Sequence, residues 1–323
     1  MRVLLLGLVF LSPPFVKILL LRWFCGARIG RHAHIGWFSA VVARHVELGE
    51  HSAVRPLTLI YLDGQFKLGD YSEISSFTLV YGSSSLVVGG QSYIGPQCLI
   101  NADEQVHLGR ESALGPRSMV FTHGSFLPYT EGYWVKLAGV TIEDRVWCAA
   151  GVFIHPGVEI GQNTFVSSRS VLTRSVPAGS VVEGNPAQVR YPMERLKRTM
   201  SPRRVDAALA QILHDFAEIG LRRELELQAV QESKHELVFR WRGAPYRITL
   251  VSSTGDVPLI GEPDPSVRQI LLVNRPDWSS PLGATVFDFV TMETPFASGH
   301  IANALRLFML RYYGIKFRDQ VQN

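Results

Sequence analysis

The chain has 323 residues, of which 46% are hydrophobic and 19% charged, and its formal net charge is +4. This length is sufficient for two domains. The basic excess is modest, and no motif of interleaved basic and aromatic residues is present, so a nucleic-acid partner is not expected. The three cysteines, Cys25, Cys98 and Cys148, are widely spaced. They argue against a disulfide framework or a zinc site and are typical of a reducing compartment.

The first 28 residues contain two apolar runs, 3–11 and 15–24, with Ser12-Pro13-Pro14 between them and Lys17 and Arg22 in the second. Two prolines break or kink a helix. Each run is about half of the roughly 20 residues that span a bilayer, and no small-residue cleavage site follows them. We interpret 1–28 as a helical segment that associates through residues 3–24 with the anionic inner face of the cytoplasmic membrane, which predicts a cytoplasmic protein held at that surface. The alternative is a pair of short helices that covers the open end of the next domain.

A pattern with a period of six runs from Ile29 to about Val176. An aliphatic residue is followed by glycine at 29–30, 35–36, 48–49, 68–69, 88–89, 94–95, 108–109, 114–115 and 160–161. Four places after the aliphatic position stands a small residue, such as Ser52, Ser72 or Cys98. A hexapeptide repeat predicts a parallel β-helix, with the aliphatic and small side chains inside. We expect glycine to serve the backbone conformation of the corners.

The repeat also gives a register. Coils of 20 residues begin at 48, 68, 88 and 108, but one face, Val120 to Thr141, is extended to 22 residues. Long excursions from a rigid scaffold often carry function. His123 is the fourth residue of this face, and the same slot in the preceding coils holds Asp103, then Ser83 and Asp63. Adjacent coils lie about 4.8 Å apart, so the register predicts that Asp103 neighbours His123.

A second domain is predicted after the repeat. Pro177, Gly184 and Pro186 end the regular coils, 191–202 forms a linker with a short helix near Pro192, and an amphipathic helix begins at Ser201-Pro202. Strand-like runs follow at 235–241, 246–251, 268–273 and 285–290, and a last helix spans about 299–312. Helix, four strands and helix predict a small α+β domain over 203–323, of unknown role.

Several motifs in 123–190 resemble the hexapeptide-repeat acetyltransferases, in the branch with galactoside, maltose and polysaccharide O-acetyltransferases. They are, in order, Thr122-His123, the segment VTIEDRVW from Val140, the segment GVFIHPGVEIG from Gly151, SVLTR from Ser170, and GNPA from Gly184. The sequence departs from the family pattern at Glu143 and at Cys148-Ala149-Ala150. The loop after His123 has its own sequence, so acceptor specificity is not implied.

The resemblance implies a left-handed parallel β-helix over 29–190, a homotrimer, and transfer of an acetyl group from acetyl-CoA to a hydroxyl of a saccharide, with no metal. It implies His123 as the general base, because histidine titrates near neutrality. Asn101 and Asp103 are candidates for binding the acceptor or orienting the imidazole. Candidate coenzyme-binding residues are Trp147, Ala150, Ser168, Thr173, Arg174 and Arg190.

Three alternatives stay open at this point. They are an N-acetyltransferase of an amino sugar, a trimeric scaffold without catalytic activity, and a relative of the γ-class carbonic anhydrases. The last needs three histidines that converge on zinc, whereas His107, His123 and His155 fall in different slots of the repeat.

Overall fold

The computed structural model describes residues 2–124, 127–253, 266–276, 278, 283–294 and 299–319. The chain forms two compact units, 1–197 and 198–323, which are described separately. The boundary between them lies within 191–202.

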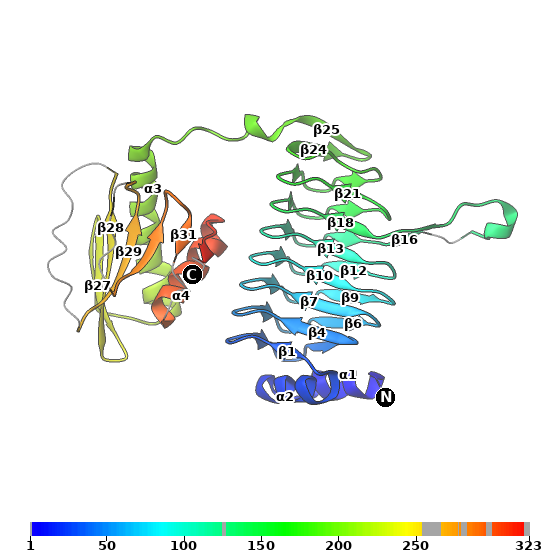
Figure 1. The fold of residues 1–323 in the computed structure, drawn as a ribbon, viewed down its shortest axis with the longest axis horizontal. Coiled ribbons are helices and arrows are strands. Elements are labelled where there is room, and N and C mark those ends of the chain that lie inside the picture. The colour runs from blue at the N-terminus through cyan, green and yellow to red at the C-terminus, as the bar shows by residue number, and fades with distance from the viewer. Residues whose placement is uncertain are drawn as a thin grey trace. The chain divides into compact units, whose positions relative to one another are not determined.

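The first unit is a parallel β-helix with three sheets, each built from one short strand per coil (Figure 1). Sheet A contains β1 (Arg28–Ile29), β4 (His45–Leu48), β7 (Gln65–Leu68), β10 (Leu86–Val88), β13 (Val106–Leu108), β18 (Val140–Ile142) and β21 (Glu159–Ile160). Sheet B contains β2 (His34–Ile35), β5 (Ala53–Val54), β8 (Glu73–Ile74), β11 (Tyr93–Ile94), β14 (Ala113–Leu114), β19 (Trp147–Cys148), β22 (Phe165–Val166), β24 (Ser180–Gly184) and β25 (Ala187–Pro192). Sheet C contains β3 (Ala40–Val42), β6 (Leu59–Leu62), β9 (Leu79–Gly82), β12 (Leu99–Asn101), β15 (Met119–Val120), β20 (Phe153–Ile154) and β23 (Val171–Leu172).

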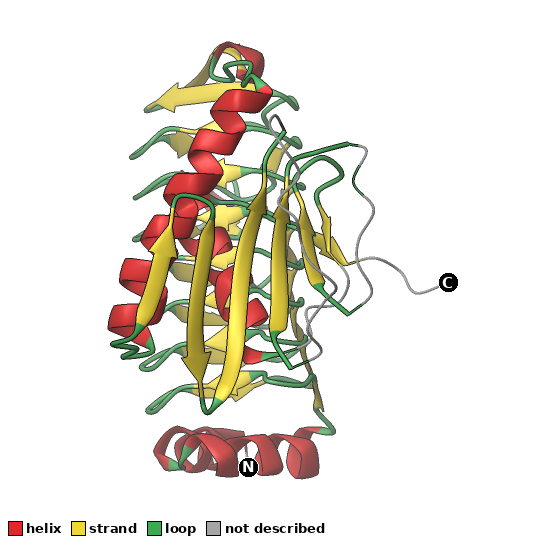
Figure 2. Ribbon diagram, turned by 90° about the vertical axis from the view of Figure 1, so that its left-hand side faces the viewer, coloured by secondary structure: helices red, strands yellow, loops and turns green. Residues whose placement is uncertain are grey.

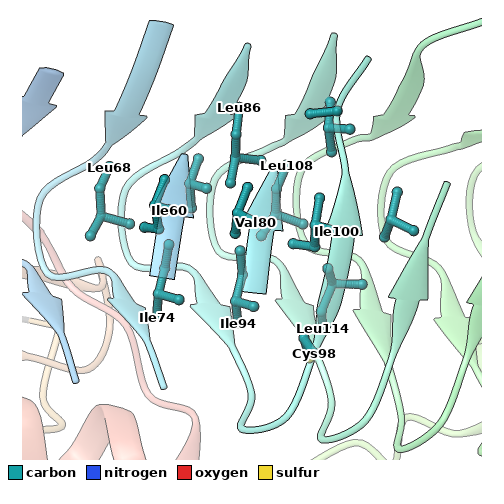
Figure 3. Close-up of a cluster of buried hydrophobic side chains, with 14 of the residues drawn as sticks. Ile60, Leu68, Ile74, Val80, Leu86, Ile94, Cys98, Ile100, Leu108 and Leu114 are labelled. Carbon is teal, nitrogen blue, oxygen red and sulfur yellow. The ribbon is translucent and has the colours of Figure 1, made fainter. Parts of the chain in front are cut away.

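The predicted aliphatic positions form the interior of the coils (Figure 3). Ile74, Ile94 and Leu114 follow one another in sheet B, and each is at most 1% exposed. The interior is continuous from the first coil to the last and offers no room for a substrate. Any chemistry of this unit therefore takes place on its surface.

The small residues of the repeat connect the coils by hydrogen bonds. The Ser72 hydroxyl donates to the carbonyl of Gly89 at 2.7 Å and accepts from the amide of Ser92 at 3.0 Å, and Ser92 repeats the pattern with Gly109 and Ser112. These side chains are buried. Because a buried hydroxyl without a partner is costly, the slot selects a small side chain that satisfies both coils.

The glycines of the repeat serve another purpose than the one expected from the sequence. A Cβ on Gly69 would lie 2.5 Å from the amide nitrogen of Gly90 in the next coil, and one on Gly89 would lie 2.6 Å from that of Arg110. The left-handed corner conformation falls two residues later on non-glycine residues, for example Tyr71 at φ 55° and Gln91 at φ 56°. The glycines are therefore required for the close approach of successive coils, and the prediction that they supply the corner conformation was wrong.

Two helices lie across the open end of the first coil (Figures 1 and 2): α1 (Arg2–Leu11) and α2 (Pro14–Cys25). Val9 and Leu21 are fully buried in the core of the β-helix. The capping arrangement that the sequence left open is thus present. No helix in the described ranges has the length and apolarity needed to cross a bilayer.

Lys17 fastens the cap to the coil. Its side chain is 0% exposed, and its ammonium donates to the carbonyls of Gly36 and Ser39, both at 2.7 Å, and of Phe10 at 3.5 Å. Burial lowers the pKa of Lys17 from 10.5 to about 8. Folding therefore disfavours the protonated form of Lys17, although the hydrogen bonds of Lys17 position the cap.

We expect this pKa shift to appear as a pH-dependent stability. Between about pH 8 and 10.5 the unfolded state binds more protons at Lys17 than the folded state does, so stability rises with pH. Between pH 7 and 10 the wild type should gain about 2–3 kcal/mol relative to Lys17→Met, an uncharged variant of similar length. Denaturant unfolding of both proteins at the two pH values measures this gain. A constant difference between them would contradict the assignment.

The far end of the β-helix carries a hairpin. Strands β24 and β25 pair antiparallel and are followed by the 3₁₀ turn η2 (Met193–Arg195). From the sequence, the regular coils are predicted to end near Pro177 and a short helix to begin near Pro192. The first of these predictions missed a β-hairpin, because Gly184 and Pro186 serve as its turn rather than as breakers.

The second unit is a mixed sheet with helices on one face (Figure 2). The sheet order is β26 (Val230–Ser233), β27 (Glu236–Trp241), β28 (Ala244–Val251), β29 (Arg268–Val273), β30 (Thr285–Asp288), β31 (Glu293–Thr294) and β32 (Arg318–Asp319). The helices are α3 (Pro202–Asp215), the π-helical η3 (Phe216–Glu224) and α4 (His300–Tyr313). The four predicted strands correspond to β27–β30. Strands β26, β31 and β32 were missed because they are short or largely polar and depend on pairing with neighbours.

Candidate active site

The structure brings His123 and Asp103 together at the corner that follows sheet C. Val120 pairs with Ile100 in adjacent strands, so His123 lies one coil above Asp103. The distance from His123 Nδ1 to Asp103 Oδ2 is 3.0 Å. The register predicted from the repeat is confirmed for this pair.

Asn101 completes the arrangement from the buried side. It is 0% exposed, and its Oδ1 lies 2.8 Å from His123 Nδ1 and accepts from the Thr122 hydroxyl at 3.0 Å. Its amide donates to Asp103 Oδ2 at 2.9 Å. Each polar atom of the Asn101 side chain therefore has a partner, which fixes the orientation of its amide.

This geometry determines the tautomer of His123. Nδ1 faces two acceptors, Asn101 Oδ1 and Asp103 Oδ2, so it carries the proton when the ring is neutral. The lone pair is then on Nε2. An imidazole held in this way can take a proton at Nε2 from a group that approaches from solvent, which is the requirement for a general base.

Asp103 is itself held as a carboxylate. The hydrogen bond from the Asn101 amide is the main cause that lowers the pKa of Asp103, with further contributions from the backbone of Ser83 and the charge of His123. The Ser83 amide donates to Asp103 Oδ1 at 3.1 Å. Ser83 occupies the slot below Asp103, so the repeat places three successive coils in one hydrogen-bonded column.

Replacing Asp103 by Asn should separate the charge effect from the geometry. The Asn variant keeps the shape but removes the negative charge beside the ring, so protonated His123 loses stabilisation. We expect kcat/KM to fall by about tenfold or more, because the imidazolium that forms when His123 takes the proton of the acceptor loses the neighbouring negative charge. An unchanged kcat/KM would show that Asp103 does not act on His123.

The long face predicted from the repeat is an arm that extends sideways from the site (Figure 1). Strands β16 (His123–Gly124) and β17 (Lys136–Leu137) pair antiparallel, and η1 (Tyr129–Glu131) lies near its tip. Exposed apolar side chains follow its described length: Leu127, Tyr129, Tyr133, Trp134, Val135 and Leu137. His123 therefore stands at the base of an arm whose apolar surface has no cover within the described part of this chain.

The candidate coenzyme-binding residues fall in two groups. Ala150 and Ser168 occupy the same slot of adjacent coils at the corner between sheets B and C, and Trp147 lies on the outer face of sheet B with its ring 5.0 Å from that of Phe165. Thr173 and Arg174 follow β23 at the opposite edge of sheet C.

Arg190 lies on the terminal hairpin, 3.8 Å from Glu183. All six residues are exposed. One copy of the chain does not bring them into a single patch.

An aromatic cluster beside His123, made of Phe121, Phe153 and His155, was not predicted from the sequence. Phe121 lies edge-on to His123 and stacks on Phe153, which packs against His155. Burial, and then the charge of Lys136, lowers the pKa of His155. The register would have placed His155 one coil above Phe121, but the approach of Lys136 depends on the path of the arm, which no repeat encodes.

No family model matches the chain. A protein of Escherichia coli named as a colanic acid biosynthesis acetyltransferase is 38% identical over 66 residues, which are 20% of this chain and 36% of that protein. The galactoside O-acetyltransferase of Lactococcus lactis is 41% identical over 51 residues, 16% of this chain and 25% of that protein. Over these segments the chain is similar to acetyltransferases. It spans about a third or less of the length of these relatives.

Among solved structures, this chain is similar to a hexapeptide-repeat acetyltransferase of Vibrio cholerae in complex with acetyl-CoA. It has 20% identity and a TM-score of 0.37, and the alignment covers 59% of this chain and 84% of that one.

The histidines required by a γ-class carbonic anhydrase do not converge within this chain. His107 lies on β13 in sheet A, whereas His123 and His155 follow strands of sheet C. Within the described residues, the group close enough to share an ion is His214, Glu218 and Glu232 in the second unit. Arg222 already contacts both glutamates there.

Proposed function

We propose that the chain is an acetyl-CoA-dependent acetyltransferase that modifies a hydroxyl of a saccharide. The observation that carries the proposal is the orientation of His123, whose Nδ1 is held by Asn101 and Asp103 while Nε2 is left for the acceptor. The similarity to acetyltransferases named for galactoside and colanic acid supports a sugar as the acceptor.

The reaction needs one proton to be moved twice. Acetyl-CoA, when bound, supplies the acetyl group as a thioester. His123 Nε2 takes the proton of the acceptor hydroxyl as its oxygen attacks the thioester carbonyl, and Asp103 stabilises the resulting imidazolium. The same proton then goes to the sulfur of the leaving thiol as the carbon–sulfur bond breaks, so the enzyme returns to its starting state.

The exposed corner at Ala150 and Ser168 fits a pantetheine arm, because neither side chain obstructs an approach to the backbone of adjacent coils. Trp147 offers a flat apolar surface beside this corner. Thr173, Arg174 and Arg190 would face the nucleotide end, where guanidinium groups suit phosphates. Thr173 and Arg174 lie at the opposite edge of sheet C from Ala150 and Ser168, so a complete site would need a second copy of the chain.

A homotrimer would supply that copy. The outer column of sheet C is wholly apolar from the second coil to the last, whereas that of sheet A is mostly polar or charged. The apolar column of sheet C consists of Leu59, Leu79, Leu99, Met119, Phe153 and Val171. An apolar strip of this length is typical of an interface between subunits. The apolar arm beside His123 would pack on the neighbour.

We also propose that the cap binds an anionic membrane surface. The side of the cap that faces away from the coils is apolar: Leu4, Leu8, Leu11, Phe15, Leu19 and Trp23 are each at least 50% exposed. Arg22, Arg28 and Arg31 are exposed in or just after the cap, and no acidic residue precedes Glu47. Exposed apolar side chains surrounded by positive charge suit a helix pair that lies in the interface of an anionic bilayer.

The catalytic proposal is tested by turnover of acetyl-CoA with nucleotide sugars, lipid-linked sugars and free polysaccharides. Release of the free thiol together with an acetyl ester on the sugar is the expected result. Transfer to an amino group instead would identify an N-acetyltransferase. Absence of turnover, with no binding of acetyl-CoA, would contradict the proposal and favour a scaffold.

A further inference from the structure

The number of coils between the cap and His123 fixes the distance of His123 from the cap along the axis of the β-helix. Strands β3, β6, β9, β12 and β15 of sheet C belong to successive coils, and His123 follows the last of them. Four steps of about 4.8 Å place His123 about 19 Å above the first coil. The ladder between these strands is parallel and continuous, so the distance does not vary by hinge motion.

The cap defines the direction in which this distance is measured. Helices α1 and α2 lie flat across the end of the coils (Figure 1). Val9, Lys17 and Leu21 are buried against the first coil, and the exposed apolar residues lie on the opposite side. A bilayer that binds this outer side therefore has its normal along the axis of the β-helix.

The height of the site above the bilayer follows. The helices add a layer about 10 Å thick. An interfacial helix buries its apolar face by about 5–10 Å. His123 then stands about 19–24 Å above the boundary between headgroups and acyl chains.

We propose that the β-helix is a spacer that holds the His123 site at this height, so that the enzyme acetylates a distal sugar of a long membrane-anchored saccharide. The inference rests on the proposed function. A single sugar attached to a membrane lipid through phosphate lies at the headgroup level, well below His123. An extended saccharide chain reaches the site without leaving the bilayer.

The height is measured without reference to catalysis. His45 and Gln105 occupy the same slot three coils apart and are both exposed. In a Cys25→Ser background, with Cys98 and Cys148 buried, His45→Cys and Gln105→Cys each accept one fluorophore. On vesicles of anionic phospholipid with a headgroup quencher, the label at 105 should lie about 14 Å farther from the surface than the label at 45. Equal distances, or no binding to the vesicles, would overturn the proposal.

The acceptor class is tested with saccharides of increasing length, either free in solution or attached to a lipid in the same vesicles. We expect turnover of lipid-attached acceptors to begin only above a threshold length, while the free saccharides are acetylated at every length. Equal turnover of the shortest and longest lipid-attached acceptors would overturn the spacer role. Loss of turnover with all free saccharides would instead contradict the proposed acetyltransferase activity, leaving the measured height unaffected.

Discussion

Replacing His123 by Ala is expected to lower turnover by about 10² to 10⁴-fold. The variant removes Nε2, the nitrogen proposed to take the acceptor's proton, while Asn101 and Asp103 keep their mutual hydrogen bond. The affinity for acetyl-CoA should change little, because His123 acts on the acceptor hydroxyl. Steady-state kinetics with saturating acetyl-CoA measures the effect.

His107→Ala is the matched control for this experiment. His107 lies in the strand of the same coil, on sheet A, and none of the contacts of the His123 site involves it. Its loss should leave turnover near that of the wild type. A folded His123→Ala protein that retains turnover within a few-fold would remove His123 from the mechanism.

Two negative charges on the outer side of the cap should strongly weaken binding to anionic vesicles. Leu8 and Leu19 are 50% and 61% exposed and make up part of the apolar surface that faces away from the coils. Their replacement by Glu removes two apolar side chains from the bilayer interface and adds charges that repel anionic lipids. We expect the affinity for anionic vesicles to fall by about 100-fold or more. Sedimentation with vesicles measures it.

The same substitutions at the other end of the β-helix control for charge alone. Val189 and Leu196 are 51% and 48% exposed on the terminal hairpin and the turn that follows it. Val189→Glu/Leu196→Glu should reduce binding only slightly. If both double variants bind as the wild type does, the cap is not the membrane-binding surface.

Turnover with a soluble saccharide separates the two functions of the chain. The cap variant should keep this activity, because Leu8 and Leu19 lie four coils or more from His123. Lost activity in the cap variant, together with a lower unfolding midpoint, would point to damage to the first coil.

The repeat predicted more than the fold class, because the side-chain pattern of a β-helix is local and periodic. The slot shared by Asp103 and His123 follows from counting, and the structure places their side chains 3.0 Å apart. The counting did not reveal how Asn101 and Thr122 are used, since their hydrogen bonds depend on side-chain orientation across two coils. It also assigned the wrong reason to the glycines, because close approach between coils is a property of the stack.

The sequence alone determined the coil register, the site of the long arm and the apolar nature of the first 28 residues, since each is written in a local pattern. Only the tertiary structure decided that Lys17 is buried in the cap and that one side of each cap helix stays exposed. Apolar residues occupy all sides of both cap helices. No periodicity in the sequence therefore distinguishes the side that covers the coil from the side that faces a membrane. The two sides become different only when the first coil of the β-helix packs against one of them.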